Sequence, residues 1–227
     1  MLIVVSTKPG RDLTKTKSWG MINLINCIWK LGEKVVTSYV HKVPCFHAGQ
    51  YREYKRRAVM DIVACAVIKA ERVLGRGGSA AWGFWDVKGR FQNVRWEGLE
   101  ERMSKSRDSL RWVPGIEQFC GFRQFRVSYD GGVNWRGSTS KWVLQGSPLS
   151  PVLFLIWIAP ILEEVEGRLG AALSGHVEVL SYVEDIHVGS YTTSAAPAGD
   201  EELTGNDWIS ILDTVMKKVG SKCSLPL

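Results

Sequence analysis

The pattern of apolar and polar positions along the chain predicts a mixture of helices and strands. Apolar residues recur at three- and four-residue intervals in the predicted helices, which span 22–40, 58–74, 96–105, 109–120, 148–173 and 207–219. The predicted strands are short apolar or alternating segments that span 1–5, 80–87, 122–129, 139–144, 177–182 and 186–191. Because helices and strands do not alternate regularly, the pattern favours an α+β fold over a doubly wound sheet.

Local signals support several of these boundaries. In the first helix, one apolar stripe follows helical spacing and predicts an amphipathic helix (Leu24, Ile28, Leu31 and Val35). The second helix runs into Gly75, Gly77 and Gly78, which stop a helix. Asp130-Gly131-Gly132 predicts a hairpin turn that joins 122–129 to 139–144.

The longest apolar run predicts a buried helix and no membrane partner. It extends from Val152 to Leu162 and contains Pro160. A membrane span needs about 20 apolar residues, and this run is about half that length. The apolar start of the chain, residues 1–5, is likewise too short for the core of a signal peptide.

Composition and cysteine spacing narrow the class of protein. The chain has 227 residues, of which 45% are hydrophobic and 23% charged, as in globular proteins. Its five cysteines are scattered, and none are spaced as a C-x-x-C pair (Cys27, Cys45, Cys65, Cys120 and Cys223). This pattern excludes a disulfide framework and predicts a reducing, intracellular compartment, nuclear or cytoplasmic.

Charge is unevenly distributed behind the modest formal net charge of +6. Residues 1–80 carry a net charge of +9, residues 81–150 carry +4, and residues 151–227 carry −7. A basic front segment favours a polyanionic partner. The acidic back segment is compatible with a cation site or with a solvated face.

Carboxylates at the ends of predicted strands are the candidate metal-binding residues. Asp86 ends the apolar strand 80–87, and Glu184-Asp185 lie between two later strands. If those strands are neighbours, the carboxylates converge into a Mg²⁺ ligand set, and two metals ~3.5–4 Å apart activate a primer hydroxyl and stabilise a leaving phosphate. The alternative is ordinary turn chemistry for each acidic residue.

Three segments together resemble the reverse transcriptases of non-LTR (LINE-type) retrotransposons, particularly fungal ones. The segment from Gln145 to Pro151 resembles the family motif Q-G-S-P-L-S-P. Tyr182 to Asp185 resembles Y-x-D-D, and Asp86 to Val94 resembles D-v-k-x-A-F-D-x-V. Lys8-Pro9-Gly10 and residues 19–36 resemble upstream segments of the same family.

The resemblance implies an architecture. We expect reverse-transcriptase-like fingers and palm, with a small antiparallel palm sheet packed on helices. The fingers-like region would span 1–80 and the palm-like region 81–227. One reverse-transcriptase domain would cover roughly 1–191, and a C-terminal helix at 207–220 would belong to the palm. The thumb of the family is expected to be absent.

The resemblance also implies roles. The implied catalytic residues are Asp86, Glu184 and Asp185, and the implied metal ligands are Asp86, the Val87 carbonyl and Asp185. The cofactor would be Mg²⁺, with Mn²⁺ as an alternative. The implied nucleotide contacts are Arg57 on the triphosphate, Phe91 as a steric gate at the sugar, and Gln145 and Gly146 over the incoming nucleotide. Partners would be an RNA template, a DNA primer and deoxynucleoside triphosphates.

The chain also departs from the family motifs. Glu184 replaces the first Asp of Y-x-D-D, Arg90 stands where the family has Ala, and Gln92 replaces an Asp. A longer carboxylate at a Mg²⁺ site misplaces the ligand, and a misplacement of this order can cost ~10²-fold in rate. These departures predict impaired polymerisation.

Three hypotheses therefore stand. The first is RNA-directed DNA synthesis by two-metal nucleotidyl transfer, with reduced activity. The second is a non-catalytic nucleic-acid-binding remnant of a retrotransposon, and the third is a relic without function. The oligomeric state, the template and the target site are not encoded in any pattern that we find.

Overall fold

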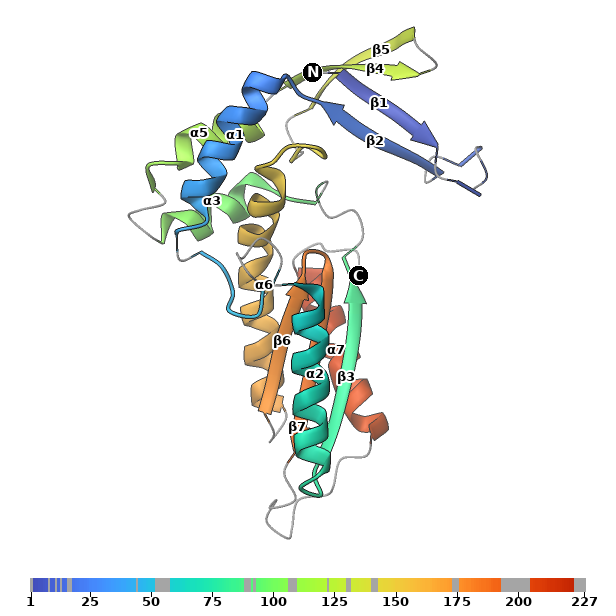
Figure 1. Ribbon diagram of the computed structural model, residues 1–227, viewed down its shortest axis with the longest axis vertical. Helices are drawn as coiled ribbons and strands as arrows, with labels where there is room; N and C mark the ends of the chain where they lie inside the picture. Colours follow the sequence, from blue (N-terminus) through green and yellow to red (C-terminus); the bar gives the residue numbers. More distant parts are fainter. Residues whose placement is uncertain are drawn as a thin grey trace. The chain divides into compact units, whose positions relative to one another are not determined.

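The structure is a computed structural model. It describes residues 2–7, 9–10, 12, 14–15, 18–43, 45–51, 58–87, 91, 93–105, 110–121, 123–129, 132–139, 143–172, 176–192 and 205–222. The chain divides into two compact units (Figure 1). The first unit comprises Met1–Cys45 and Phe91–Trp157, and the second comprises Phe46–Arg90 and Ile158–Leu227. The division into a fingers-like region at 1–80 and a palm-like region at 81–227 stays a prediction.

In its described residues, the first unit contains a four-stranded sheet and three helices that lie wholly within it. The strands are β1 (Leu2–Thr7), β2 (Trp19–Leu24), β4 (Arg123–Tyr129) and β5 (Gly132–Thr139). The helices are α1 (Cys27–Val40), α3 (Trp96–Ser104) and α5 (Val113–Cys120). The strand order is β2-β1-β4-β5. Only β1 and β4 are parallel, and the other two pairs are antiparallel.

Two predicted elements of this unit are wrong in their boundaries. The predicted helix 22–40 is a strand followed by a helix, because β2 pairs with β1 from Trp19 to Leu24. Asn26 then caps α1, accepting a hydrogen bond from the Ile28 N–H at 2.9 Å. The return strand predicted at 139–144 is instead β5, which ends at Thr139 and pairs with β4.

The second unit contains the small antiparallel sheet that the sequence predicts. Its strands are β3 (Ser79–Asp86), β6 (His176–Tyr182) and β7 (Asp185–Thr192), in the order β3-β7-β6. Helix α2 (Val59–Leu74) contacts β3 and β7, and α7 (Gly205–Lys222) contacts β3. The predicted α+β fold class is therefore confirmed.

Helix α6 (Ser150–Ala172) begins in the first unit and ends in the second. Residues Val152 to Ala159 are all buried, so the apolar run is a core helix, as predicted. A helix that is apolar on all sides is stable only where every face is covered. Within the described ranges, no helix has the length and apolar character that crossing a membrane requires.

A polar cluster lies where α2 covers the sheet. Lys69 forms an ion pair with Glu178 of β6, and the Cys65 thiol donates to the same carboxylate at 3.8 Å. Burial lowers the pKa of Lys69, but hydrogen bonding to Glu178 and its charge outweigh it, so that this pKa is raised. Burial, together with the charge of Glu178, raises the pKa of Tyr191 on β7. The cluster thus holds one cation and one neutral phenol beside a carboxylate.

The segment before α2 is attached to β6 by backbone hydrogen bonds. Ser181 donates to the Gly49 carbonyl at 2.8 Å and accepts from the Tyr51 N–H at 2.9 Å. His47 accepts from the Gly49 N–H at Nδ1, so its Nε2 carries the proton and donates to Glu166 of α6 at 3.2 Å. A Cβ on Gly49 would lie 1.9 Å from the Val179 carbonyl oxygen, so only glycine fits there.

Candidate active site

Two of the predicted catalytic carboxylates lie opposite each other in the sheet of the second unit. The antiparallel register pairs Asp86, the last residue of β3, with Asp185, the first residue of β7. Residues that face each other in such a pair have Cβ atoms about 4.5–5.5 Å apart and point to the same side of the sheet. Both side chains are exposed. On its other side, Asp185 pairs with Tyr182 of β6.

The third predicted carboxylate, Glu184, lies in the tight turn between β6 and β7. Val183 has a φ of +59°, in the left-handed region that a side chain other than glycine rarely adopts. The Glu184 carbonyl accepts a hydrogen bond from the Val87 N–H at 3.0 Å. This bond ties the turn to the end of β3. It also fixes the backbone of Val87, whose side chain is buried.

These residues provide a carboxylate pair for a cation. Exposed carboxylate oxygens with room for water are suited to a hard divalent cation such as Mg²⁺, which is usually bound by one or two carboxylates plus substrate oxygens. Asp86 and Asp185 are both exposed and face each other in the strand register. Over the residues for which side chains are placed, no group of three or more His, Cys, Asp or Glu side chains gathers at metal-binding distance. The predicted catalytic role of Glu184 stays a prediction.

Aromatic side chains extend along β3 from the carboxylate pair. Phe84, which is 68% exposed, meets His187 edge to face at 5.0 Å between ring centroids. Trp82 stacks at 6.5 Å on Phe84, and its ring occupies the space where a Cβ on Gly189 would lie. Burial lowers the pKa of His187, although the nearby Asp185 charge opposes this shift. The sheet edge therefore combines two carboxylates with an exposed aromatic face.

In the first unit, the Gln145–Ser147 loop is tied to β2. The Gln145 carbonyl accepts hydrogen bonds from the Asn23 backbone N–H and from Asn23 Nδ2, both at 3.1 Å. Gly146 has a φ of +104°, and a Cβ there would lie 3.0 Å from the Asn23 carbonyl oxygen. The glycine is therefore required by the turn. Gln145 and Gly146 are both exposed.

The same loop is tied to α1 through a buried carboxylate. The Ser147 hydroxyl donates to Glu33 Oε2 at 2.5 Å and accepts from the Leu149 N–H at 3.1 Å. Glu33 is only 5% exposed. A buried carboxylate needs hydrogen bonds to offset its lost hydration, and Ser147 supplies one. The motif serine thus connects α1 to the start of α6.

Of the two remaining predicted nucleotide contacts, the structure describes Phe91 but not Arg57. Phe91 packs edge to face on Phe154 of α6 at 6.1 Å. Arg57 lies outside the described residues. Phe91, Gln145 and Gly146 belong to the first unit, and Asp86 and Asp185 to the second. The roles of all these residues stay predictions.

Sequence reasoning missed Asn23 and gave Glu33 no role. Asn23 was assigned to a helix, where its position carries no signal for a loop contact. Glu33 was matched only as part of an upstream family segment. The predicted stripe of Ile28, Leu31 and Val35 places Glu33 on the opposite, polar face of the helix, so the pattern gave no signal for its burial.

Comparison with known proteins was made at the level of sequence and fold. The family model for reverse transcriptase (RNA-dependent DNA polymerase) matches residues 7–224. No curated protein matches the chain in sequence. Similar solved structures include apo telomerase from Candida tropicalis, truncated from its C-terminal domain, with a TM-score of 0.54 at 10% identity. That match covers 86% of this chain and 37% of the telomerase chain.

A second similar structure is telomerase from Candida albicans in complex with a TWJ fragment of telomeric RNA. The TM-score is 0.58 at 10% identity, and the match covers 97% of this chain and 39% of that one. At this identity the likeness shows a common fold, and the chain spans well under half the length of either telomerase chain. Since the family model covers nearly the whole sequence, the chain belongs to the reverse transcriptase family.

Proposed function

We propose that this reverse-transcriptase-domain protein performs RNA-directed nucleotidyl transfer at the Asp86–Asp185 edge, with reduced activity. The observation that carries the proposal is the register that sets these two carboxylates opposite each other, exposed, at the ends of β3 and β7. The substrates would be an RNA template, a DNA primer and deoxynucleoside triphosphates. We further propose the non-LTR retrotransposon class, fungal in type, from the motif wording alone.

The proposed metal ligands are Asp86, Asp185 and the Val87 carbonyl, with Mg²⁺ or Mn²⁺ as the cation. When bound, such a cation polarises the primer 3′-hydroxyl and neutralises charge on the leaving pyrophosphate. The chain's own contribution is to fix the two carboxylates. The β3–β7 pairing fixes their positions along the strands, and the Val87–Glu184 hydrogen bond fixes the adjacent turn.

The proposed nucleotide contacts are those that the family motifs imply. Gln145 and Gly146 would lie over the incoming nucleotide, Phe91 would exclude a 2′-hydroxyl, and Arg57 would hold the triphosphate. Phosphoryl transfer depends mostly on positioning and charge neutralisation, so the two ties to Asn23 and Glu33 would keep the loop in place. We propose the fingers-like region at 1–80 and the palm-like region at 81–227.

Primer extension on an RNA template with Mg²⁺ or Mn²⁺ tests this function. We expect weak extension by the wild type and a rise, up to ~10²-fold, in Glu184→Asp, because the shorter side chain matches the aspartate of the family motif and returns the carboxylate to the place that the motif gives it. In that background, Asp86→Asn or Asp185→Asn should reduce extension by about 10²-fold or more, because each removes a charge from the metal site. Exposed Glu100 on α3 provides the matched control, Glu100→Gln.

The proposal fails if Glu184→Asp combined with Arg90→Ala gives no extension with either metal. It also fails if Asp86→Asn is as active as its background.

A non-catalytic nucleic-acid-binding protein is the second candidate. Two observations favour it: the lack of a three-residue metal cluster among the described side chains and the exposed Arg126 and Arg136 on β4 and β5. It predicts salt-dependent binding to an RNA–DNA hybrid without extension in any variant. Absence of binding at low salt contradicts it.

A further inference from the structure

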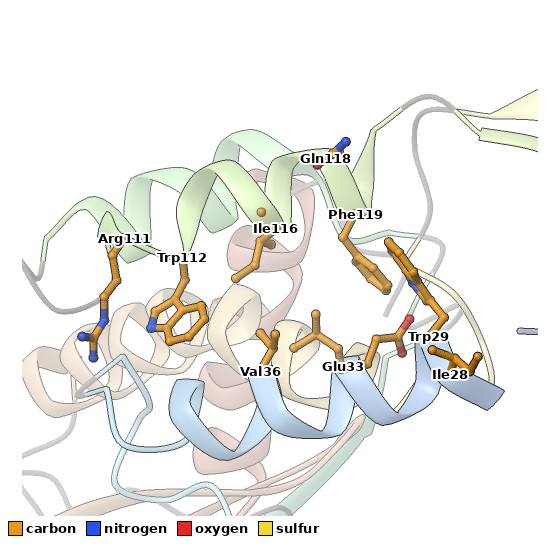
Figure 2. A pocket seen from close by; sticks show the side chains of 12 residues that line it. Ile28, Trp29, Glu33, Val36, Arg111, Trp112, Ile116, Gln118 and Phe119 are labelled. Atoms are coloured by element: carbon orange, nitrogen blue, oxygen red, sulfur yellow. The ribbon is translucent and has the colours of Figure 1, made fainter. Parts of the chain in front are cut away.

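A pocket of about 500 Å³ lies between α1 and α5 of the first unit, and none of its lining residues belongs to the predicted active site (Figure 2). Its volume is in the range of pockets that hold small organic molecules. Three aromatic side chains form much of its wall: Trp29 from α1, Trp112 just before α5, and Phe119 from α5.

Two glycines line this pocket, one from each helix. Gly32 lies within α1 and Gly115 within α5, and a Cβ built on either one meets no atom within 4 Å. Glycine in a helix is destabilising relative to alanine. Both helices therefore give up stability at the point where side chains would fill the pocket. An open slot of this kind fits a flat ligand.

One carboxylate lines the pocket, next to aromatic side chains. Glu33 is 5% exposed, and Figure 2 shows its carboxylate beside Trp29, with Phe119 on the α5 side. A charge in a poorly solvated site attracts an opposite charge more strongly than it does in water. Aromatic faces add attraction for a cation and stacking for a flat ring. The chemistry of this end of the pocket therefore favours an ammonium group.

Among the described residues that line the pocket, the cation is Arg111. The Arg111 guanidinium is positioned over the Trp112 ring, 5.4 Å from its centroid. Figure 2 shows Arg111 at the opposite end of the row of side chains from Glu33. Repulsion from Arg111 would therefore act at the other end, so the ammonium of a ligand is directed to Glu33.

We propose that this pocket binds a flat aromatic amine. The ammonium group would pair with Glu33, and the ring would lie in the slot that Gly32 and Gly115 leave open between the aromatic side chains. The ammonium would share the Glu33 carboxylate with the Ser147 hydroxyl, which already donates to it. This site does not depend on the proposed polymerase activity.

Calorimetric titration of the full chain with tryptamine and with its neutral analogue tryptophol tests the proposal. We expect tryptamine to bind at least about tenfold more tightly, as a charged hydrogen bond in a buried site provides. Glu33→Gln should remove this preference while still binding tryptophol, which shows that the pocket remains formed. Glu117→Gln, on the exposed face of α5, should behave as the wild type.

A second variant tests the location independently of Glu33. A Cβ at Gly115 meets no atom within 4 Å, so we expect Gly115→Leu to keep or raise Tm. Because Gly115 lines the pocket, we expect the added side chain to abolish binding of both probes. The proposal is overturned by equal affinities for the two probes, by no binding of either, by a preference that persists in Glu33→Gln, or by unchanged binding in Gly115→Leu. If Glu33→Gln does not fold, the wild-type comparison and Gly115→Leu decide the question.

Discussion

At the scale of single residues, backbone geometry places two carboxylates next to each other, at the end of β3 and the start of β7. Asp86 and Asp185 face each other because β3 and β7 are in register. The adjacent turn places Val183 in a left-handed conformation, which costs about 1–3 kcal/mol and is kept only where the surroundings demand it. The Val87–Glu184 hydrogen bond is part of those surroundings. The strained residue, Val183, therefore lies in the same turn that leads into Asp185.

The positive φ of Gly146 leads to a stability prediction. Gly146→Ala should destabilise the protein by about 1–3 kcal/mol, because a Cβ at a φ of +104° is strained and approaches the Asn23 carbonyl oxygen. Urea denaturation followed by tryptophan fluorescence measures the change. The control Gly170→Ala, in α6 with open space around its Cβ, should stabilise the protein by up to about 1 kcal/mol. Equal destabilisation of both variants would contradict the turn geometry.

At the scale of elements, the sequence predicts the second unit better than the first. The strands that form the small sheet are apolar and bounded by turn residues, so their positions were predicted to within a few residues. Strand β2 was missed because its apolar residues continue the helical spacing of α1, and only pairing with β1 separates the two elements. The stripe Leu24, Ile28, Leu31 and Val35 is exposed, while Glu33 is buried. Periodicity shows that a helix has two faces, but its partners decide which face is covered.

The cluster between α2 and the sheet leads to a prediction at alkaline pH. The folded state raises the pKa of Tyr191 above 10.0 and that of Lys69 above 10.5. As pH rises past these values, the unfolded chain loses its protons first, so both groups stabilise the folded state at lower pH and lose that contribution as pH increases. Tm should therefore fall as pH rises above 10.0, the ordinary pKa of tyrosine.

Comparing Tyr191→Phe with the wild type isolates the phenol, because the other alkaline groups titrate in both proteins. The fall in Tm should be smaller in Tyr191→Phe, and the two proteins should have similar Tm near neutral pH. Parallel Tm curves across this range would show that Tyr191 titrates normally in the folded state.

At the scale of the whole molecule, the distribution of charge separates a basic front from an acidic back, as the sequence alone shows. The structure adds a specific feature, since Arg126 of β4 and Arg136 of β5 are directly opposite each other and exposed. Like charges across a strand pair are destabilising, and an anion between them relieves the repulsion. The sequence did not predict this pair because β5 was expected several residues later. A polyanion is the natural partner for such a face.

Binding of an RNA–DNA hybrid at several salt concentrations tests this pair. Arg126→Gln combined with Arg136→Gln should weaken binding and reduce the slope of log K against log salt by about 1–2, because each arginine that contacts a phosphate releases counterions. The control Lys217→Gln removes a lysine that is already paired with Asp213 at 2.6 Å, so its slope should not change. An unaltered slope in the double variant would place the nucleic-acid contacts elsewhere.

The pairing of β3 with β7 has a consequence for how the protein emerges from the ribosome. Every partner of β3 in this sheet comes from residues about a hundred positions later, from Thr192 back to Asp185. In the other sheet, β1 pairs locally with β2, but its second edge pairs with β4 only later, since Leu2 pairs with Arg126. Pairings of such long range form slowly and leave strand edges open in the meantime. During translation, the nascent chain carries β3, with its tryptophans and Phe84, unpaired until β7 has been made. That interval is when chaperones would be needed most.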